Sequence, residues 1–146
     1  MRILILALLL AGPAAAAPAP PVSKAMQTPA AGCGAALRAE ADAESFSADG
    51  ARLTRETGTA FVAAATRLCA AGALRPAHLA PFARLLVRSS DVSADPVVYD
   101  DAEQGADALI LEYAFPGGRA PAAAAIETAL RCWREPTRAG CDQGGE

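Results

Sequence analysis

The sequence predicts an α+β fold in which three or four short helices pack on a small antiparallel hairpin or sheet and disulfides stabilise the domain. Three observations predict it. Apolar residues recur at helical spacing within residues 53–71 and 121–134. Residues 108–115 alternate with the period of a strand. Four cysteines follow an apolar N-terminal segment. A small all-α bundle is the alternative, and it would require residues 108–115 to form a helix.

The N-terminus has the organisation of a secretory signal peptide over residues 1–16. Arg2 precedes an apolar run over residues 3–11, and Ala14–Ala16 supply the small residues of a cleavage site. We expect cleavage after Ala16, with the position after Ala19 as the second choice. The run is far shorter than the about 20 apolar residues that span a bilayer, and no cysteine directly follows it for lipid attachment. We therefore expect a periplasmic or secreted protein without a stable membrane anchor.

The remaining chain divides into an arm and one domain. Residues 17–32 are rich in proline and alanine, which is typical of a flexible arm. Residues 33–146 contain enough large apolar residues for one small globular domain.

The four cysteines are Cys33, Cys69, Cys132 and Cys141. An even number in an exported chain favours two disulfides, although three pairings are possible. We favour Cys132–Cys141, whose short loop would tie the tail to the last helix, and this leaves Cys33–Cys69. The latter closes a loop of about 36 residues, which the chain-entropy relation values at roughly 3–4 kcal/mol. No C-x-x-C sequence or zinc-ligand spacing occurs, so we expect neither a metal nor a cofactor.

In the first half of the domain we expect two helices. Residues 35–44 are alanine-rich with interspersed charges, and residues 47–50 form a turn. The second helix lies between Leu53 and Ala71 and ends at Gly72. Its apolar face consists of Thr57, Phe61, Ala64, Ala65 and Leu68.

In the second half, two prolines favour a helix that begins within residues 78–81 and presents Leu79, Phe82, Ala83 and Leu86 on one face. Leu85–Val87 also fit the beginning of a strand, and this alternative stays open. Residues 89–96 form a loop. Strands at 97–99 and 108–115 are joined as a hairpin by the acidic residues 100–107. A final helix over 121–134 buries Ala122, Ile126, Ala129, Leu130 and Trp133.

The charge composition argues against nucleic acid as a partner. Loss of Arg2 with the leader reduces the 13 basic residues to 12, against 16 acidic residues. An acidic domain with a single lysine is a poor binder of a phosphate backbone.

Two features have the composition of a chemical site. His78, the single histidine, is suited to acid–base catalysis, and a serine triad would have to combine it with a serine such as Ser89 or Ser90 and a nearby carboxylate. No G-x-S-x-G sequence is present, and we interpret His78 as an exposed residue at a loop–helix junction. In the acidic segment, Asp101, Glu103, Asp107 and Glu112 have part of the spacing of a calcium-binding EF-hand. Glycine at the fifth position and strand-like flanks favour a solvated hairpin loop instead.

Glu112 is a charged residue inside an apolar strand. If it is buried, Arg84 or Arg88 would be a suitable partner, and an apolar surrounding would raise its pKa and allow it to act as a general acid. Arg131, Arg134 and Arg138 follow near the end of the last helix. We interpret them as cations that complement the helix C-terminus rather than as a phosphate or carboxylate site.

Two functions fit these features. The first is an exported, non-enzymatic binding or inhibitor-like module of unknown ligand, with an extracytoplasmic protein as its partner. The alternative is a small periplasmic hydrolase that uses Glu112 with Asp100, Asp101 or Asp107. A cleft with converging carboxylates would favour the enzyme, whereas a flat or convex apolar patch would favour binding.

Overall fold

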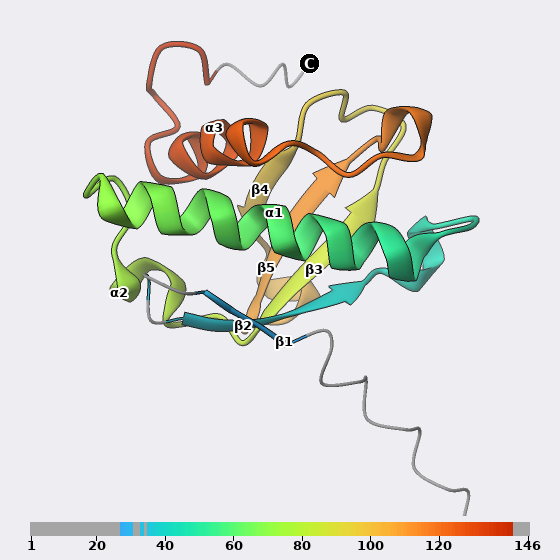
Figure 1. Cartoon of the computed structure of the whole chain (residues 1–146), viewed down its shortest axis with the longest axis horizontal. Coiled ribbons are helices and arrows are strands. Elements are labelled where there is room, and N and C mark those ends of the chain that lie inside the picture. The colour runs from blue at the N-terminus through green and yellow to red at the C-terminus, as the bar shows by residue number, and fades with distance from the viewer. Residues whose placement is uncertain (1–26, 31–32, 34, 142–146) are drawn as a thin grey trace, which may run out of the picture.

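The computed structural model describes residues 27–30, 33 and 35–141. The expected leader, most of the expected arm and residues 142–146 lie outside the described residues. The molecule has two layers, in which helices α1 and α3 cover one face of a five-stranded sheet (Figure 1). The expectation of a disulfide-linked chain that combines α and β elements is therefore confirmed.

The elements follow one another along the chain. They are β1 (Gln27–Ala30), β2 (Ala35–Ala41), α1 (Gly50–Ala70), α2 (Pro76–Leu79), β3 (Arg84–Ser89), β4 (Val97–Asp100), β5 (Ala108–Tyr113) and α3 (Ala123–Arg134). Three single 3₁₀ turns lie between them, at Ala43–Ser45, Ala102–Gln104 and Pro116–Gly118.

The sheet is mixed rather than antiparallel. Its strand order is β1-β2-β3-β5-β4. The three central strands β2, β3 and β5 run parallel, and β1 and β4 are antiparallel edges. The expected pairing of residues 97–99 with 108–115 is present as β4–β5. The hairpin is only one edge of a larger sheet, because β5 also pairs with β3 and a helical crossover through α1 connects β2 to β3.

The prediction of a helix over residues 35–44 is wrong, because Ala35–Ala41 form strand β2. Leu37 and Ala39 are buried whereas Arg38 is exposed, which is the period of a strand with one face on the core. Alanine favours a helix locally, but pairing with β1 on one side and β3 on the other outweighs that preference. The same pairing makes residues 27–30 of the expected flexible arm an edge strand.

The predicted helix that begins near residues 78–81 is also wrong, and the strand alternative for Leu85–Val87 is correct. Helix α2 is a single turn that ends at Leu79. Ala80 still has helical backbone angles, but Pro81 has no N–H with which to continue the helical hydrogen bonds. Leu85 and Val87 are both buried, as expected for alternate residues of a strand between two neighbours.

The two long helices lie where the sequence places them. α1 buries the whole predicted face and ends before Gly72, whose φ of 72° is a left-handed conformation suited to glycine. α3 buries Ile126, Ala129 and Leu130, whereas Ala122 precedes the helix and is exposed. Among the described helices, none combines the length and the apolarity needed to cross a membrane.

Candidate functional site

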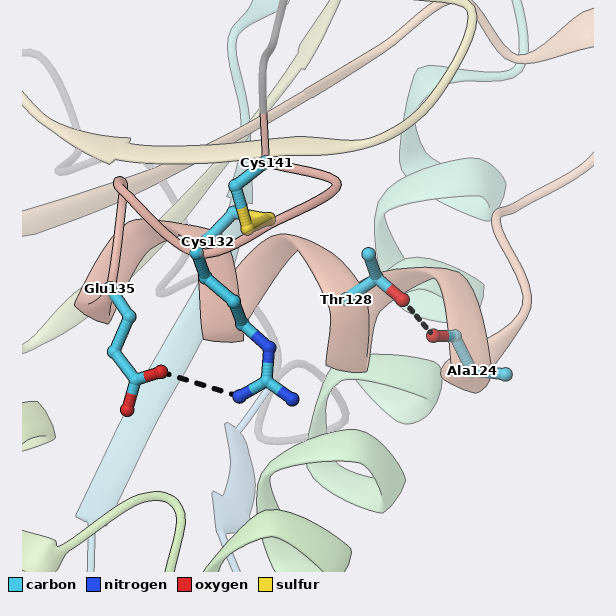
Figure 2. The surroundings of a disulfide bond; sticks show 6 residues. Ala124, Thr128, Cys132, Glu135 and Cys141 are labelled. Carbon is cyan, nitrogen blue, oxygen red and sulfur yellow. Dashed lines mark hydrogen bonds and ion pairs between the residues drawn. A yellow bond between two sulfur atoms is a disulfide. The ribbon is translucent and has the colours of Figure 1, made fainter.

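The cysteines are paired as the sequence predicts, Cys33 with Cys69 and Cys132 with Cys141. The first pair joins the β1–β2 connection to the last turn of α1, across a Cα–Cα distance of 5.8 Å. The second pair, with a Cα–Cα distance of 5.2 Å, folds the segment after α3 back onto that helix (Figure 2). No cysteine of the described residues is free, so all four serve as crosslinks.

The loop closed by Cys132–Cys141 is folded into two successive turns. Arg138 N donates to Glu135 O at 3.0 Å, and Cys141 N donates to Arg138 O at 3.0 Å. The segment after α3 is therefore ordered by backbone hydrogen bonds as well as by the disulfide.

The sheet face opposite α1 and α3 carries a polar network around two apolar residues. Glu40, Leu86, Ile110 and Tyr99 lie in register across four strands. Ile110 is fully buried although none of the described helices covers this face. The next residues of β3 and β5 on the same face are Arg84, Arg88 and Glu112, which are long and polar.

Arg88 is the centre of this network. Its Nε donates to Asp42 Oδ2 at 2.8 Å, and its Nη1 donates to the hydroxyl of Tyr99 at 3.0 Å. The Tyr99 hydroxyl in turn donates to Glu112 Oε2 at 2.9 Å. Burial, followed by the hydrogen bond to Glu112, raises the pKa of Tyr99 above its ordinary value. The chain of bonds connects two carboxylates through a cation and a phenol: Arg88 pairs with Asp42, and Glu112 is held by hydrogen bonds.

Glu112 does not have the environment of a general acid. It is half-buried, and Ser93 Oγ donates to its Oε1 at 2.7 Å. Burial alone would raise the pKa of Glu112, but hydrogen bonds from Ser93, Tyr99 and Ser90 and the charge of Arg88 outweigh burial and lower it. The condition for a raised pKa, an apolar surrounding, is therefore not met, because the groups around this carboxyl are polar. The positive charge of Arg88 acts on Glu112 at a distance, because the two side chains do not form a direct ion pair.

The carboxylates of residues 100–107 do not converge on Glu112. Asp100 Oδ1 accepts from Trp133 Nε1 at 3.0 Å, and Asp101 Oδ1 accepts from the backbone of Glu103 at 2.9 Å. Asp107, which directly precedes the first residue of β5, pairs with Arg84 at 3.0 Å. Glu112 lies near the other end of that strand. Five residues of a strand separate these two by about 17 Å.

The same carboxylates do not form a metal site. Within residues 27–30, 33 and 35–141, no group of three His, Cys, Asp or Glu side chains is placed to hold a metal ion. The flanks of residues 101–107 are strands β4 and β5 rather than the helices of an EF-hand.

His78 lies half-buried in α2, where its Nδ1 accepts from the backbone of Arg75 at 3.1 Å. Burial, the charge of Arg134 and that of Arg75 lower its pKa. Ser89 and Ser90 lie at the far end of β3, so the structure does not bring a serine nucleophile to this histidine. The interpretation of a junction residue fits its position, but the side chain is less exposed than expected.

Two non-glycine residues have left-handed backbone conformations that sequence reasoning did not anticipate. Asp49 has a φ of 57° and Phe115 a φ of 51°. Both flank α1 at its N-terminal end, where Arg52 contacts Asp49 Oδ2 at 3.4 Å and Gly118 O at 3.1 Å. The Phe115 ring packs on Phe46 with a centroid distance of 5.4 Å. The structure therefore holds both strained residues through side-chain contacts.

An aromatic cluster at the end of α3 was also not predicted. The Phe82 and Trp133 rings meet edge to face, with centroids 5.8 Å apart. The Arg134 guanidinium lies over the Trp133 ring, 5.1 Å from its centroid. The only sequence signal for this cluster is the group of arginines near the end of the helix, of which Arg138 pairs with Glu135 at 3.3 Å.

No known protein family, curated protein or solved structure matches the chain.

Proposed function

We propose that the protein is exported to the periplasm or the medium after cleavage at Ala16 and acts there as a non-enzymatic binding module. Its partner is an extracytoplasmic protein. The pairing of all four cysteines supports an oxidising compartment, where such bonds form and persist. The crosslinks hold the two ends of the described chain against α1 and α3, which gives a small domain a fixed surface to present to a partner.

The observation that carries this proposal is the state of the carboxylates. Each of the four acidic side chains named for a hydrolase already has a partner: Asp100 accepts from Trp133, Asp101 from the backbone of Glu103, Asp107 pairs with Arg84, and Glu112 accepts two hydroxyl hydrogen bonds. A glycosidase-type mechanism needs two carboxyl groups less than about 10 Å apart on one bond of the substrate. The hydrolase alternative therefore has less support than binding.

Site-specific photocrosslinking of the exported protein tests this proposal. A crosslinkable residue replaces one of four exposed residues on different parts of the surface, Ala48, Ala77, Val92 or Ala139. We expect an adduct of one defined mass from at least one position. An excess of unlabelled protein should compete for it. Absence of adducts at all four positions, together with a hydrolytic activity that Glu112→Gln abolishes, would favour the enzyme instead.

A further inference from the structure

Basic residues of two separate segments lie near the Trp133 ring. Arg75 and His78 come from the beginning of α2, and Arg134 from the last turn of α3. The backbone of Arg75 donates to His78 Nδ1 at 3.1 Å, and Phe82, four residues after His78, packs on the Trp133 ring that Arg134 covers. These contacts bring the α2 segment to the end of α3. Arg75 and Arg134 are exposed, and Trp133 is half-buried beneath the Arg134 guanidinium. We call Arg75, His78, Phe82, Trp133 and Arg134 the Trp133 surface.

Arg75 and Arg134 have no counter-ion among residues 27–30, 33 and 35–141. Six other arginines form ion pairs, namely Arg38, Arg52, Arg67, Arg84, Arg88 and Arg138. Arg75 and Arg134 have no such pair with any carboxylate in the part of the chain that the structure describes. The dipole at the end of α3 supplies only about half an elementary charge, and it does not account for Arg75. Without the leader the protein has 12 basic and 16 acidic residues, yet this corner carries two exposed arginines without an ion pair among the described residues, and the Asp100 carboxylate beside them is bonded to Trp133 Nε1.

The aromatic rings at this corner are held in place before any partner arrives. Trp133 Nε1 donates to Asp100 Oδ1, and Phe82 packs against the edge of the indole. Fixing the ring in advance removes part of the entropy cost of binding. Tryptophan and arginine together are the residues most enriched among those that dominate the energy of protein interfaces.

We propose that the Trp133 surface binds an acidic segment of a partner protein, with carboxylates at Arg75 and Arg134 and an apolar side chain against the Trp133 ring. This rests on the proposed binding function and names the chemistry of the partner. A free phosphate would gain nothing from the ring.

The test measures binding of a defined acidic peptide to the full, disulfide-bonded chain. The probe is the tryptophan-free peptide acetyl-Glu-Leu-Asp-Glu-Leu-Glu-amide, and its Gln/Asn counterpart is the neutral control. Trp133 is the single tryptophan of the chain, so its fluorescence reports on this surface. We expect a saturable change in Trp133 emission with the acidic peptide, weakened by salt, and none with the neutral one.

Paired charge-removing variants locate the site. For Arg75→Gln with Arg134→Gln, anisotropy of the labelled peptide should show about tenfold weaker binding, which corresponds to about 1.4 kcal/mol. The matched control is Arg55→Gln with Arg119→Gln, which removes the same charge from two exposed arginines elsewhere that also lack an ion pair. Its affinity should stay near that of the unaltered chain.

Three results would overturn the proposal: no preference for the acidic peptide, equal weakening by both variant pairs, or displacement of the peptide by an equal concentration of inorganic phosphate. Binding of phosphatidylglycerol vesicles that depends on Arg75 and Arg134 would replace the protein partner with a lipid. If the peptide fails to bind while Val92 or Ala48 still gives a crosslinked adduct, the binding function stands and only its location is wrong.

Discussion

Removal of the two disulfides separately should destabilise the protein by different amounts, in an order that their loops determine. Cys33 and Cys69 are 36 residues apart, and Cys132 and Cys141 are 9 residues apart. The chain-entropy relation gives about 3.8 kcal/mol for the longer loop and about 2.6 kcal/mol for the shorter one. The double variant Cys33→Ala/Cys69→Ala should therefore lose about 1.2 kcal/mol more than Cys132→Ala/Cys141→Ala.

Urea unfolding followed by far-ultraviolet circular dichroism measures both losses. Removal of a crosslink exposes more surface in the unfolded chain, so the slope of free energy against urea should also rise, and more for the longer loop. An equal or larger loss for the Cys132–Cys141 pair would refute the reasoning. It would mean that packing around the sulfur atoms, rather than loop closure, decides what each crosslink contributes.

Three further substitutions test the core, the backbone and the network. Thr54 and Thr57 have fully buried hydroxyls without a hydrogen-bond partner, so valine at either position should raise the free energy of unfolding by about 1 kcal/mol. The control Thr59→Val, at an exposed position, should leave the free energy of unfolding unchanged. Absence of a gain at both buried positions would contradict the prediction. Asp49→Ala should be about 1 kcal/mol less stable than Asp49→Gly, because only glycine adopts the left-handed conformation without strain; equal stabilities in urea would argue against it. The pKa of Glu112 is lowered on folding, so its contribution is present above the unfolded pKa of about 4.3 and lost as the pH falls through the folded value. Glu112→Gln should then flatten the decrease in stability below about pH 5, and an unchanged pH profile would count against the network.

The elements with strong local patterns could be predicted from the sequence. α1 and α3 carry apolar residues at helical spacing, and β5 places Leu109 and Leu111 in the core as predicted, although it ends at Tyr113 rather than at residue 115. The disulfide pairing also followed from the argument about loop length. In each case the deciding information lies within one segment or in the spacing of one residue type.

The parallel centre of the sheet could not be predicted, because it depends on contacts between distant segments. β2 contains a helix-favouring run of alanines, and only its pairing with β1 and β3 makes it a strand. β3 is short enough for its apolar residues to fit either period, and the proline at 81 suggested a helix start rather than a helix end.

The surroundings of the candidate sites could not be predicted for the same reason. The partners of Glu112 come from the loop at Ser93 and the edge strand at Tyr99, which no spacing along the chain reveals. The Trp133 surface joins residues 75–82 to residues 133–134 across the fold. The sequence shows that charged and aromatic residues are present, but the structure decides which of them already have partners.

The most direct test of the account is the intact mass of the protein recovered from the exported fraction without reducing agent. The account predicts a chain that begins at Ala17 and is lighter than its reduced form by the four hydrogen atoms that two disulfides remove. A chain that keeps Met1 and carries four free thiols would contradict export, the crosslinks and binding outside the cytoplasm together.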